Sequence, residues 1–243
     1  MTNECHGPKN AMILAAGLGT RMRPLTDIIP KPLIKVAEKP LIQFSLEALS
    51  KFTAANVVVN IHYLPLQMRE FLRNYPEVNI HISDESNKLL DSGGGIKNAL
   101  HLLGPYPFFI LNADSFWIDG GASNLDRLSK AWDSNRMDIL LMLAAGTQIT
   151  GYSGYGDFMM NQNGQLRRRP EKTVSPFVYT GVALISPKIF CETPSGPFSL
   201  NILFDRAIEH ERLYGVRLDG DWYHVGTPDS IDEAEQKIVL NKY

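Results

Sequence analysis

The residues best suited to chemistry lie in one short stretch, MILAAGLGTRMRPLT, which runs from Met12 to Thr26. An apolar run leads into a loop that contains two glycines, and Arg21 and Arg23 follow directly. Glycine lets a backbone approach a ligand closely, free N–H groups can cradle phosphates, and guanidinium groups fork onto phosphate oxygens. The stretch therefore predicts a site for a phosphorylated ligand, although Arg23 could instead pin the loop to a neighbouring carboxylate.

The glycines of this loop do not match the two best-known phosphate loops. A dinucleotide-binding loop needs a third glycine where this chain has Met22, and an acidic residue after the second strand, which here ends in NIHY. A P-loop needs Gly-Lys followed by Ser or Thr, which this loop lacks. Taken alone, Gly17 and Gly19 could also form a plain tight turn.

A second candidate, Asp114, directly follows another apolar run, FFILNA. A carboxylate at the end of a buried strand can bind a hard cation such as Mg²⁺, or it can form an Asx turn. The histidines are scattered without metal-ligand spacing, so packing or solvent exposure is expected for His62, His81, His101 and His210.

Apolar runs alternate with helical patterns over the first 145 or so residues. Strands are predicted at Ala11–Ala16, Val57–Ile61, Val78–Ile82, Pro107–Leu111 and Ile139–Ala144. Helices are predicted from just after Pro40 to Phe52, and at Pro65–Tyr75, Gly95–Leu103 and Asn124–Asp133. This order predicts an α/β fold, with a mixed, mostly parallel sheet flanked by helices on both faces. Ligands bind beyond the carboxyl ends of such strands, where the glycine loop lies.

The pattern changes after about residue 145. A glycine-rich polar segment with a turn at Asn163-Gly164 predicts a hairpin, and thus a small inserted antiparallel region. A strand is predicted at Phe177–Ile185 and a helix at Asn201–Arg212. A closing helix is predicted to start at Thr227-Pro228 and run to Leu240.

The composition is that of an ordinary globular protein. The chain has 243 residues and a formal net charge of −2, which argues against nucleic acid or an anionic membrane as a partner. The N-terminus lacks the apolar segment of a signal peptide, and no apolar run is long enough to span a membrane. Two cysteines, Cys5 and Cys191, make no disulfide framework, so a cytoplasmic protein is expected.

Several stretches together resemble the sugar-1-phosphate nucleotidylyltransferases. They are LAAGLGTRMRPLT with PKPLIKVAEKPLI at 30–42, NADS at 112–115, YTGVALISP at 179–187 and WYHVGTPDS at 222–230. The resemblance spans most of the chain and implies that family's Rossmann-like fold. The short length and DSGGG at 91–95 are most similar to the compact members, the N-acetylmuramate α-1-phosphate uridylyltransferases, and next to the mannose-1-phosphate guanylyltransferases.

The resemblance implies a reaction in which a sugar phosphate attacks the α-phosphorus of a nucleoside triphosphate and pyrophosphate leaves. Such a nucleophile is already ionised, so the site needs positioned cations and a metal rather than a strong base. By analogy with the family, Arg21 and Lys31 contact the phosphates, and Asp114 binds Mg²⁺, with Mn²⁺ as another possible metal. The expected substrates are UTP or GTP and a sugar 1-phosphate.

The family's binding residues map onto two groups of positions. The nucleotide would contact Leu14, Ala15, Ala16, Gly17, Gly19, Thr20, Arg21, Lys31, Gly94 and Gly95. The sugar would contact Asn112, Gly156, Asp157, Arg168, Thr180 and Gly181. Arg168 lies in a run of three arginines on the predicted hairpin, and such runs are usually solvated.

These roles divide the chain. Residues 1–10 are expected to be a disordered tail and 11–243 a single domain, with a nucleotide-binding half at 11–145 and a sugar-binding half at 146–243. The family's larger members carry a C-terminal assembly domain, and this chain ends at Tyr243, so a monomer or weak dimer is expected.

One position departs from the family pattern. Near the C-terminus, the family has Trp-x-Asp-Val-Gly-Thr with a metal-binding aspartate, whereas this chain has His224 at that position. His224 could ligate a metal, favouring Mn²⁺ or Zn²⁺, or bind phosphate as a cation. It could also mark a site too weak for catalysis. Three interpretations follow: an enzyme that makes UDP-N-acetylmuramate, one that makes GDP-mannose, and a non-catalytic nucleotide-sugar sensor.

Overall fold

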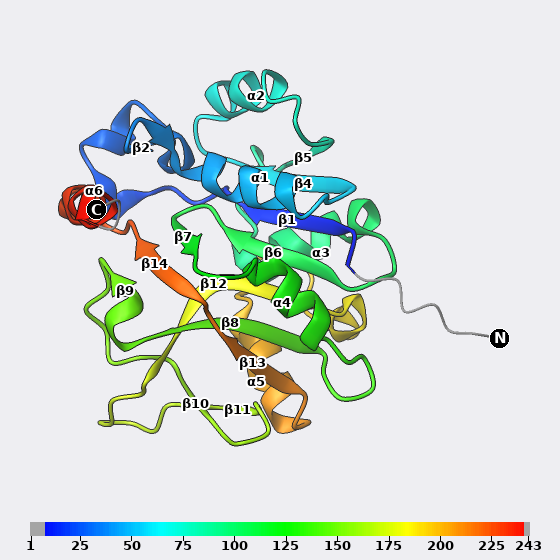
Figure 1. Cartoon of the computed structure of the whole chain (residues 1–243). Helices are drawn as coiled ribbons and strands as arrows, with labels where there is room; N and C mark the ends of the chain where they lie inside the picture. Colours follow the sequence, from blue (N-terminus) through cyan, green and yellow to red (C-terminus); the bar gives the residue numbers. More distant parts are fainter. Residues whose placement is uncertain (1–7, 241–243) are drawn as a thin grey trace.

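The centre of the protein is a nine-stranded sheet, whose first half is parallel (Figure 1). The structure is a computed structural model that describes residues 8–240. Neighbouring strands run in the order β6-β1-β4-β5, and all three pairings are parallel. Their bounds are β1 (Asn10–Leu14), β4 (Asn56–Ile61), β5 (Ile80–Asp84) and β6 (Phe108–Asn112). The strands predicted there are confirmed, with ends shifted by one or two residues.

The second half of the sheet is mostly antiparallel. β12 (Phe177–Ile185) lies antiparallel between β6 and β8 (Ile139–Ala145), and β13 (Leu213–Arg217) pairs in parallel with β8. β10 (Phe158–Met160) and β11 (Leu166–Arg168) form the predicted hairpin. The turn needs a glycine at Gly164, whose φ is +83°. The mixed, mostly parallel sheet that the sequence predicts is therefore confirmed.

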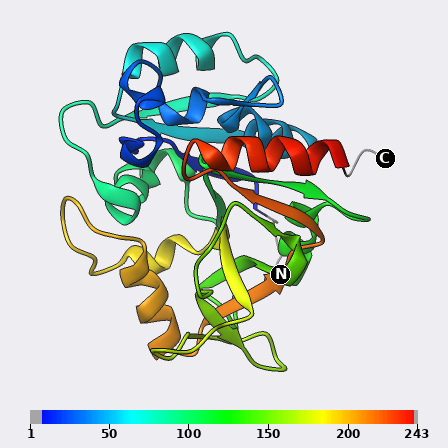
Figure 2. The same ribbon diagram turned by 90° about the vertical axis from the view of Figure 1, so that its left-hand side faces the viewer.

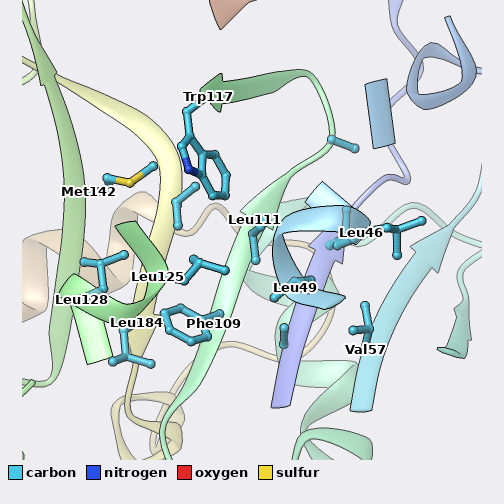
Figure 3. Close-up of a cluster of buried hydrophobic side chains, with 14 of the residues drawn as sticks. Leu46, Leu49, Val57, Phe109, Leu111, Trp117, Leu125, Leu128, Met142 and Leu184 are labelled. Carbon is cyan, nitrogen blue, oxygen red and sulfur yellow. The ribbon is translucent and has the colours of Figure 1, made fainter. Parts of the chain in front are cut away.

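Helices cover both faces of this sheet. They are α1 (Leu41–Lys51), α2 (Pro65–Arg73), α3 (Asp91–Leu103), α4 (Asn124–Ala131) and α5 (Asn201–Glu209), whereas α6 (Asp229–Leu240) packs on a smaller second sheet. In β1, Ile13 packs with α1, α2 and α4 on one face, while Met12 packs with α3 and α5 on the other. Figure 3 shows the first of these clusters, in which Leu46 of α1 and Leu128 of α4 lie against side chains from the sheet. Side chains alternate along a strand, so a sheet buried on both faces needs the continuous apolar runs seen in the sequence.

A second, three-stranded sheet lies beside the first. β14 (Gly220–His224) pairs antiparallel with β7 (Ser115–Asp119) and parallel with β9 (Ile149–Thr150). Figure 2 shows α6 in red, crossing the molecule between the N-terminal elements above and the C-terminal ones below. Tyr223 of β14 stacks on Phe116 of β7 with ring centroids 4.8 Å apart, and both are buried beneath α6. These short strands carry no clear pattern in the sequence and were not predicted.

The remaining elements are short. A two-stranded ribbon consists of β2 (Lys35–Val36) and β3 (Lys39–Pro40). The 3-10 turns are η1 (Thr20–Met22), η2 (Leu25–Asp27), η3 (Lys31–Leu33), η4 (Gly146–Gln148) and η5 (Pro187–Phe190). Among residues 8–240, no helix combines the length and apolar character that crossing a membrane requires.

Several of the predicted boundaries are wrong, and α5, for example, ends at Glu209 and not at Arg212. The expected tail over 1–10 lies mostly outside the described residues, as does Cys5, but Asn10 already pairs with Asn56 in β1. Helix α3 begins at Asp91 and not at Gly95, because tertiary packing overrides the low helix propensity of three glycines. The closing helix begins at Asp229, two residues after Thr227, whose N–H donates to the Ser230 hydroxyl.

Candidate active site

A cavity of about 490 Å³ opens at the carboxyl ends of β1, β4, β5 and β6. We call it the strand-end cavity. Of the predicted site residues, it is lined by Leu14, Ala15, Ala16, Gly17, Lys31, Asn112 and Asp114. The lining that the sequence analysis missed is Pro32, Asn60, Glu85, Leu89, Asp91, Ser92, Ala113 and Pro197. This is the place where ligands bind in open α/β sheets.

The glycines of the loop after β1 have different roles. Gly19 has a φ of +65°, and a Cβ there would lie 2.8 Å from the Thr26 side chain and 3.0 Å from Cβ of Lys31. The Thr26 hydroxyl donates to the Gly19 carbonyl, so Gly19 closes the loop on itself. A Cβ at Gly17, by contrast, would meet nothing within 4 Å among the described residues. Gly17 therefore leaves open space at the cavity wall.

Lys31 and Asp114 form a close ion pair at the cavity edge. Lys31 Nζ lies 2.8 Å from Asp114 Oδ2, and the lysine side chain is only 11% exposed. Burial alone would raise the pKa of Asp114, but the positive charge of Lys31, the hydrogen bond that Lys31 donates and the charge of Arg21 hold this pKa below its ordinary value. The carboxylate is therefore ionised at neutral pH.

The imidazole of His224 lies next to this pair. Its ring stacks on Trp222 with centroids 5.7 Å apart and meets the edge of Tyr152 at 6.4 Å. Burial lowers the pKa of His224, and the charges of Lys31 and Arg21 lower it further against the opposing pull of Asp114. The ring is therefore neutral at neutral pH, which is the form that binds metals.

Arg21 completes the group. A Cβ on Gly226 would lie 2.7 Å from Nε2 of His224 and 3.4 Å from an Nη atom of Arg21, so both side chains converge over this glycine. The same two residues line a second hollow of about 590 Å³ with the start of α6. Arg21, Lys31, Asp114 and His224 thus gather between the two hollows.

The predicted sugar-binding residues other than Asn112 are held by contacts within the protein. The Thr180 hydroxyl donates to the Met142 carbonyl, and a carboxylate oxygen of Asp157 accepts the N–H of Tyr179. Gly181 has a φ of +86°, and a Cβ there would lie 2.8 Å from the side chain of Asn112. At Gly156 a Cβ would run into the carbonyl of Ser175.

Two of the predicted arginines pair with carboxylates. Arg168 is bound to Asp205 of α5 at 2.7 Å and lies over the Phe158 ring at 5.0 Å, which holds it on the hairpin. Arg23 lies 3.3 Å from Asp27 in its own loop, and this confirms the structural interpretation given for Arg23.

The glycines at the start of α3 pack against other parts of the protein and do not line the cavity. A Cβ at Gly94 would lie 2.5 Å from the carbonyl oxygen of Gly196, and one at Gly95 would lie 2.7 Å from Oε1 of Glu85. The missing side chains thus make room for other parts of the protein. The first turn of α3 meets the cavity through Asp91 and Ser92 instead. The sequence does hold a clue to Asn60 and Glu85, because each is polar and lies near the end of a buried strand.

The donor set for a metal is small. Among residues 8–240, no three His, Cys, Asp or Glu side chains gather into a group that could hold a metal ion. Asp114 and His224 are two adjacent donors, one an ionised carboxylate and the other a neutral imidazole. A cation at this place would need further ligands from a bound phosphate or water.

Comparisons with known proteins find relatives that match nearly the whole chain. The N-acetylmuramate alpha-1-phosphate uridylyltransferase of Caulobacter vibrioides is 43% identical over 238 residues, which cover 96% of this chain and 98% of that protein. The mannose-1-phosphate guanyltransferase of Hypocrea jecorina is 31% identical, and the match covers 89% of this chain but 60% of that protein. A crystal structure of UDP-glucose pyrophosphorylase with UDP-glucose matches 96% of this chain and 99% of its own with a TM-score of 0.81. Its identity is only 20%, so it supports the fold alone.

A family profile described as nucleotidyl transferase matches residues 10–240, nearly the whole chain. That span contains the glycine loop, the Lys31–Asp114 pair and His224. The chain therefore belongs to the nucleotidyl transferase family, and the resemblance drawn from its sequence is confirmed.

Proposed function

We propose that this enzyme transfers a uridylyl group from UTP to N-acetylmuramate α-1-phosphate, releasing pyrophosphate and forming UDP-N-acetylmuramate. The observation that carries the reaction type is the gathering of Arg21, Lys31 and Asp114 at the edge of the strand-end cavity. The choice of base and sugar is supported by the 43% identity to a uridylyltransferase of this name.

In the proposed reaction, the protein positions charge and needs no strong base. A phosphate oxygen of the sugar forms the new bond to the α-phosphorus, and the bond from that phosphorus to the bridging oxygen of the leaving pyrophosphate breaks. Negative charge builds up on the phosphate oxygens as this happens, and positioned cations stabilise it. Lys31 is nearly buried and so acts as a fixed charge, while the Arg21 guanidinium can hold two oxygens at once.

Asp114 and His224 fit a divalent cation, and we include Mg²⁺ or Mn²⁺ in the proposal. Carboxylate oxygen suits Mg²⁺, whereas imidazole suits transition metals better. When bound, such an ion would neutralise phosphate charge as a Lewis acid. Lys31 already holds Oδ2 of Asp114, so the metal and the lysine would share this carboxylate.

Two other functions stay open as outcomes of the test. Synthesis of GDP-mannose is favoured by the 31% identity to a mannose-1-phosphate guanyltransferase. A non-catalytic sensor is favoured by His224, which stands where the family pattern has an aspartate. We further propose a cytoplasmic protein that works as a monomer or weak dimer.

The decisive experiment is a pyrophosphate-release screen. UTP, GTP, CTP and ATP are each paired with N-acetylmuramate, N-acetylglucosamine, glucose and mannose 1-phosphates in Mg²⁺ and in Mn²⁺. Fast release is expected from UTP with N-acetylmuramate α-1-phosphate. Fastest release from GTP with mannose 1-phosphate would replace the proposal by the guanylyltransferase. If no pair releases pyrophosphate although nucleotide sugars bind, the sensor takes its place.

A further inference from the structure

Two buried polar side chains in the wall of the strand-end cavity belong to one chain of hydrogen bonds. Asn60 near the end of β4 and Glu85 just after β5 are each 3% exposed. Asn60 Oδ1 accepts the N–H of Ala15 at 2.8 Å, and Asn60 Nδ2 donates to Glu85 Oε1 at 2.8 Å. The other carboxylate oxygen of Glu85 accepts the N–H of Leu90 at 3.1 Å. We call these two side chains, with the two backbone groups, the Asn60–Glu85 relay.

The two ends of the relay hold two different walls of the cavity. Ala15 is the first residue after β1 and starts the loop that leads to Gly17. Leu90 precedes α3, whose first residues Asp91 and Ser92 line the cavity. The relay therefore fixes the backbone of the glycine loop relative to the start of α3, although these segments are about 75 positions apart in the sequence.

The order of donors and acceptors in the relay is fixed. Both ends are backbone N–H groups, so both must meet an acceptor, and the amide of Asn60 can satisfy one end only with its oxygen. Its NH₂ group then needs an acceptor, which the Glu85 carboxylate supplies while its second oxygen serves Leu90. Gly95 leaves the space that this carboxylate occupies, because a Cβ at Gly95 would lie only 2.7 Å from Oε1 of Glu85.

We propose that Asn60 and Glu85 are positioning residues for the nucleoside triphosphate. They hold the glycine loop and the first turn of α3 at the spacing that the nucleotide bridges, and they act through Ala15 and Leu90. The inference rests on the proposed function in one respect, that the strand-end cavity takes the nucleotide. It makes no demand on the sugar or on the product.

Two single variants disrupt the hydrogen bonds of the relay while keeping the size of each side chain. Asn60→Asp sets a second carboxylate against Glu85, and Glu85→Gln turns an NH₂ group toward another donor. Each leaves a buried group unpaired, so UTP titrated into the folded variant by calorimetry is expected to bind about tenfold more weakly. KM for UTP should rise in parallel, while KM for the sugar 1-phosphate stays within about twofold.

The double variant Asn60→Asp, Glu85→Gln reverses the relay and restores every bond. The new carboxylate at position 60 accepts from Ala15 and from the new amide at position 85, whose oxygen accepts from Leu90. UTP affinity is expected to return to within about threefold of the wild type. The proposal is overturned if the double variant binds no better than the weaker single variant. It is also overturned if both single variants bind UTP like the wild type.

A matched control lies elsewhere in the fold. Asn124 is also buried, and its Nδ2 donates to Asp119 Oδ1 at 2.6 Å, between α4 and β7. Asn124→Asp should lower the melting temperature and leave UTP affinity unchanged. An equal loss of UTP affinity there would mean that any buried asparagine has this effect, and the proposal would fail.

Two arrangements keep the test decisive. If a single variant does not fold, the double variant is compared with the wild type alone, and a loss of UTP affinity above about threefold contradicts the proposal. Each protein is also titrated with GTP, and pyrophosphate release is scored separately. The nucleotide affinities of the relay variants can therefore still be compared with that of the wild type, even if the proposed base or the proposed sugar acceptor is wrong.

Discussion

The two halves of the molecule supply the active site in different ways. The N-terminal half provides Arg21, Lys31 and Asp114 from loops that directly follow β1 and β6, two adjacent parallel strands. The C-terminal half provides His224 from β14, a short strand of a separate small sheet. In the N-terminal half, the carboxyl ends of the parallel strands lie at one edge of the sheet. A residue that follows such a strand in the sequence is therefore brought to the site.

In the second half, position in the site depends on pairing between distant segments. His224 lies opposite Ser115, next to Asp114, because β14 pairs with β7 in one register. Tyr223, buried against Phe116, fixes that register, since a slip of one residue would put the tyrosine outside. The cations therefore come from the architecture of the sheet, while the position of His224 comes from side-chain packing.

Removing the cations that the N-terminal half supplies should lower activity more than any other change. Lys31→Ala and Arg21→Ala should each lower turnover about a hundredfold or more, the scale of losing one charge contact in a transition state. The measurement is kcat for pyrophosphate release with purified, folded protein. Arg168→Ala is the control, since this arginine is paired with Asp205 on the hairpin, and its kcat should stay within about threefold of the wild type.

Near-normal turnover in either cation variant would remove that residue from the mechanism. A large loss of turnover in Arg168→Ala, with the fold intact, would instead give the hairpin a part in the reaction. The C-terminal half would then contribute to turnover through the hairpin as well as through His224.

The same contrast decides how much could be predicted from the sequence. The parallel strands, the helices on both faces and the charges after β1 and β6 follow from local patterns: an apolar run, a loop and a polar residue at its end. The strands β7, β9 and β14 are five residues long or shorter and have no local pattern of their own. Their pairing with one another and the packing of Phe116 and Tyr223 under α6 hold them as strands.

Asn60 and Glu85 show a further limit of sequence analysis. Their polar side chains near strand ends are a weak clue in the sequence, and the hydrogen bonds between them appear only when β1, β4 and β5 lie side by side. The sequence places the start of this helix at Gly95 because glycine usually breaks helices, whereas α3 includes the glycines at 93–95, where close contacts with Phe198, Gly196 and Glu85 leave no room for a side chain. Propensity is a local property, and these contacts are not.

A second prediction separates packing glycines from site glycines. Gly94→Ala places a Cβ 2.5 Å from the Gly196 carbonyl, and forcing α3 away should destabilise the fold by about 1–3 kcal/mol. Gly17→Ala meets open space and should leave stability within about 0.5 kcal/mol, while it raises KM for the nucleotide. Urea unfolding and steady-state kinetics on both variants test this. Equal stability of the two variants would contradict the packing role of Gly94.

A third prediction concerns His224, which the C-terminal half supplies. His224→Asp replaces an imidazole by a carboxylate, which Mg²⁺ prefers, so Mg²⁺ binding in the presence of nucleotide should tighten roughly tenfold. Activity with Mg²⁺ should be kept or raised. The check is a Mg²⁺ titration of wild type and variant, each with and without UTP. Identical metal affinity in both proteins would show that position 224 does not face the metal.

The smallest expected effect is a pH dependence of stability that comes from His224. Its pKa is lowered in the folded state by burial and by Lys31 and Arg21, whereas in the unfolded chain it is about 6.5. As the pH falls from 7.5 through this value, the unfolded chain takes up a proton that the folded protein does not, so the free energy of unfolding decreases. Asp114 does not contribute here, because its pKa is lowered and it titrates in the acidic range below about 4. Urea unfolding of the metal-free protein between pH 7.5 and 5 should therefore show a smaller decrease for His224→Asn than for the wild type. Equal decreases in the two proteins would show that the imidazole is not held neutral, and the proposed neutral ligand at position 224 would be lost.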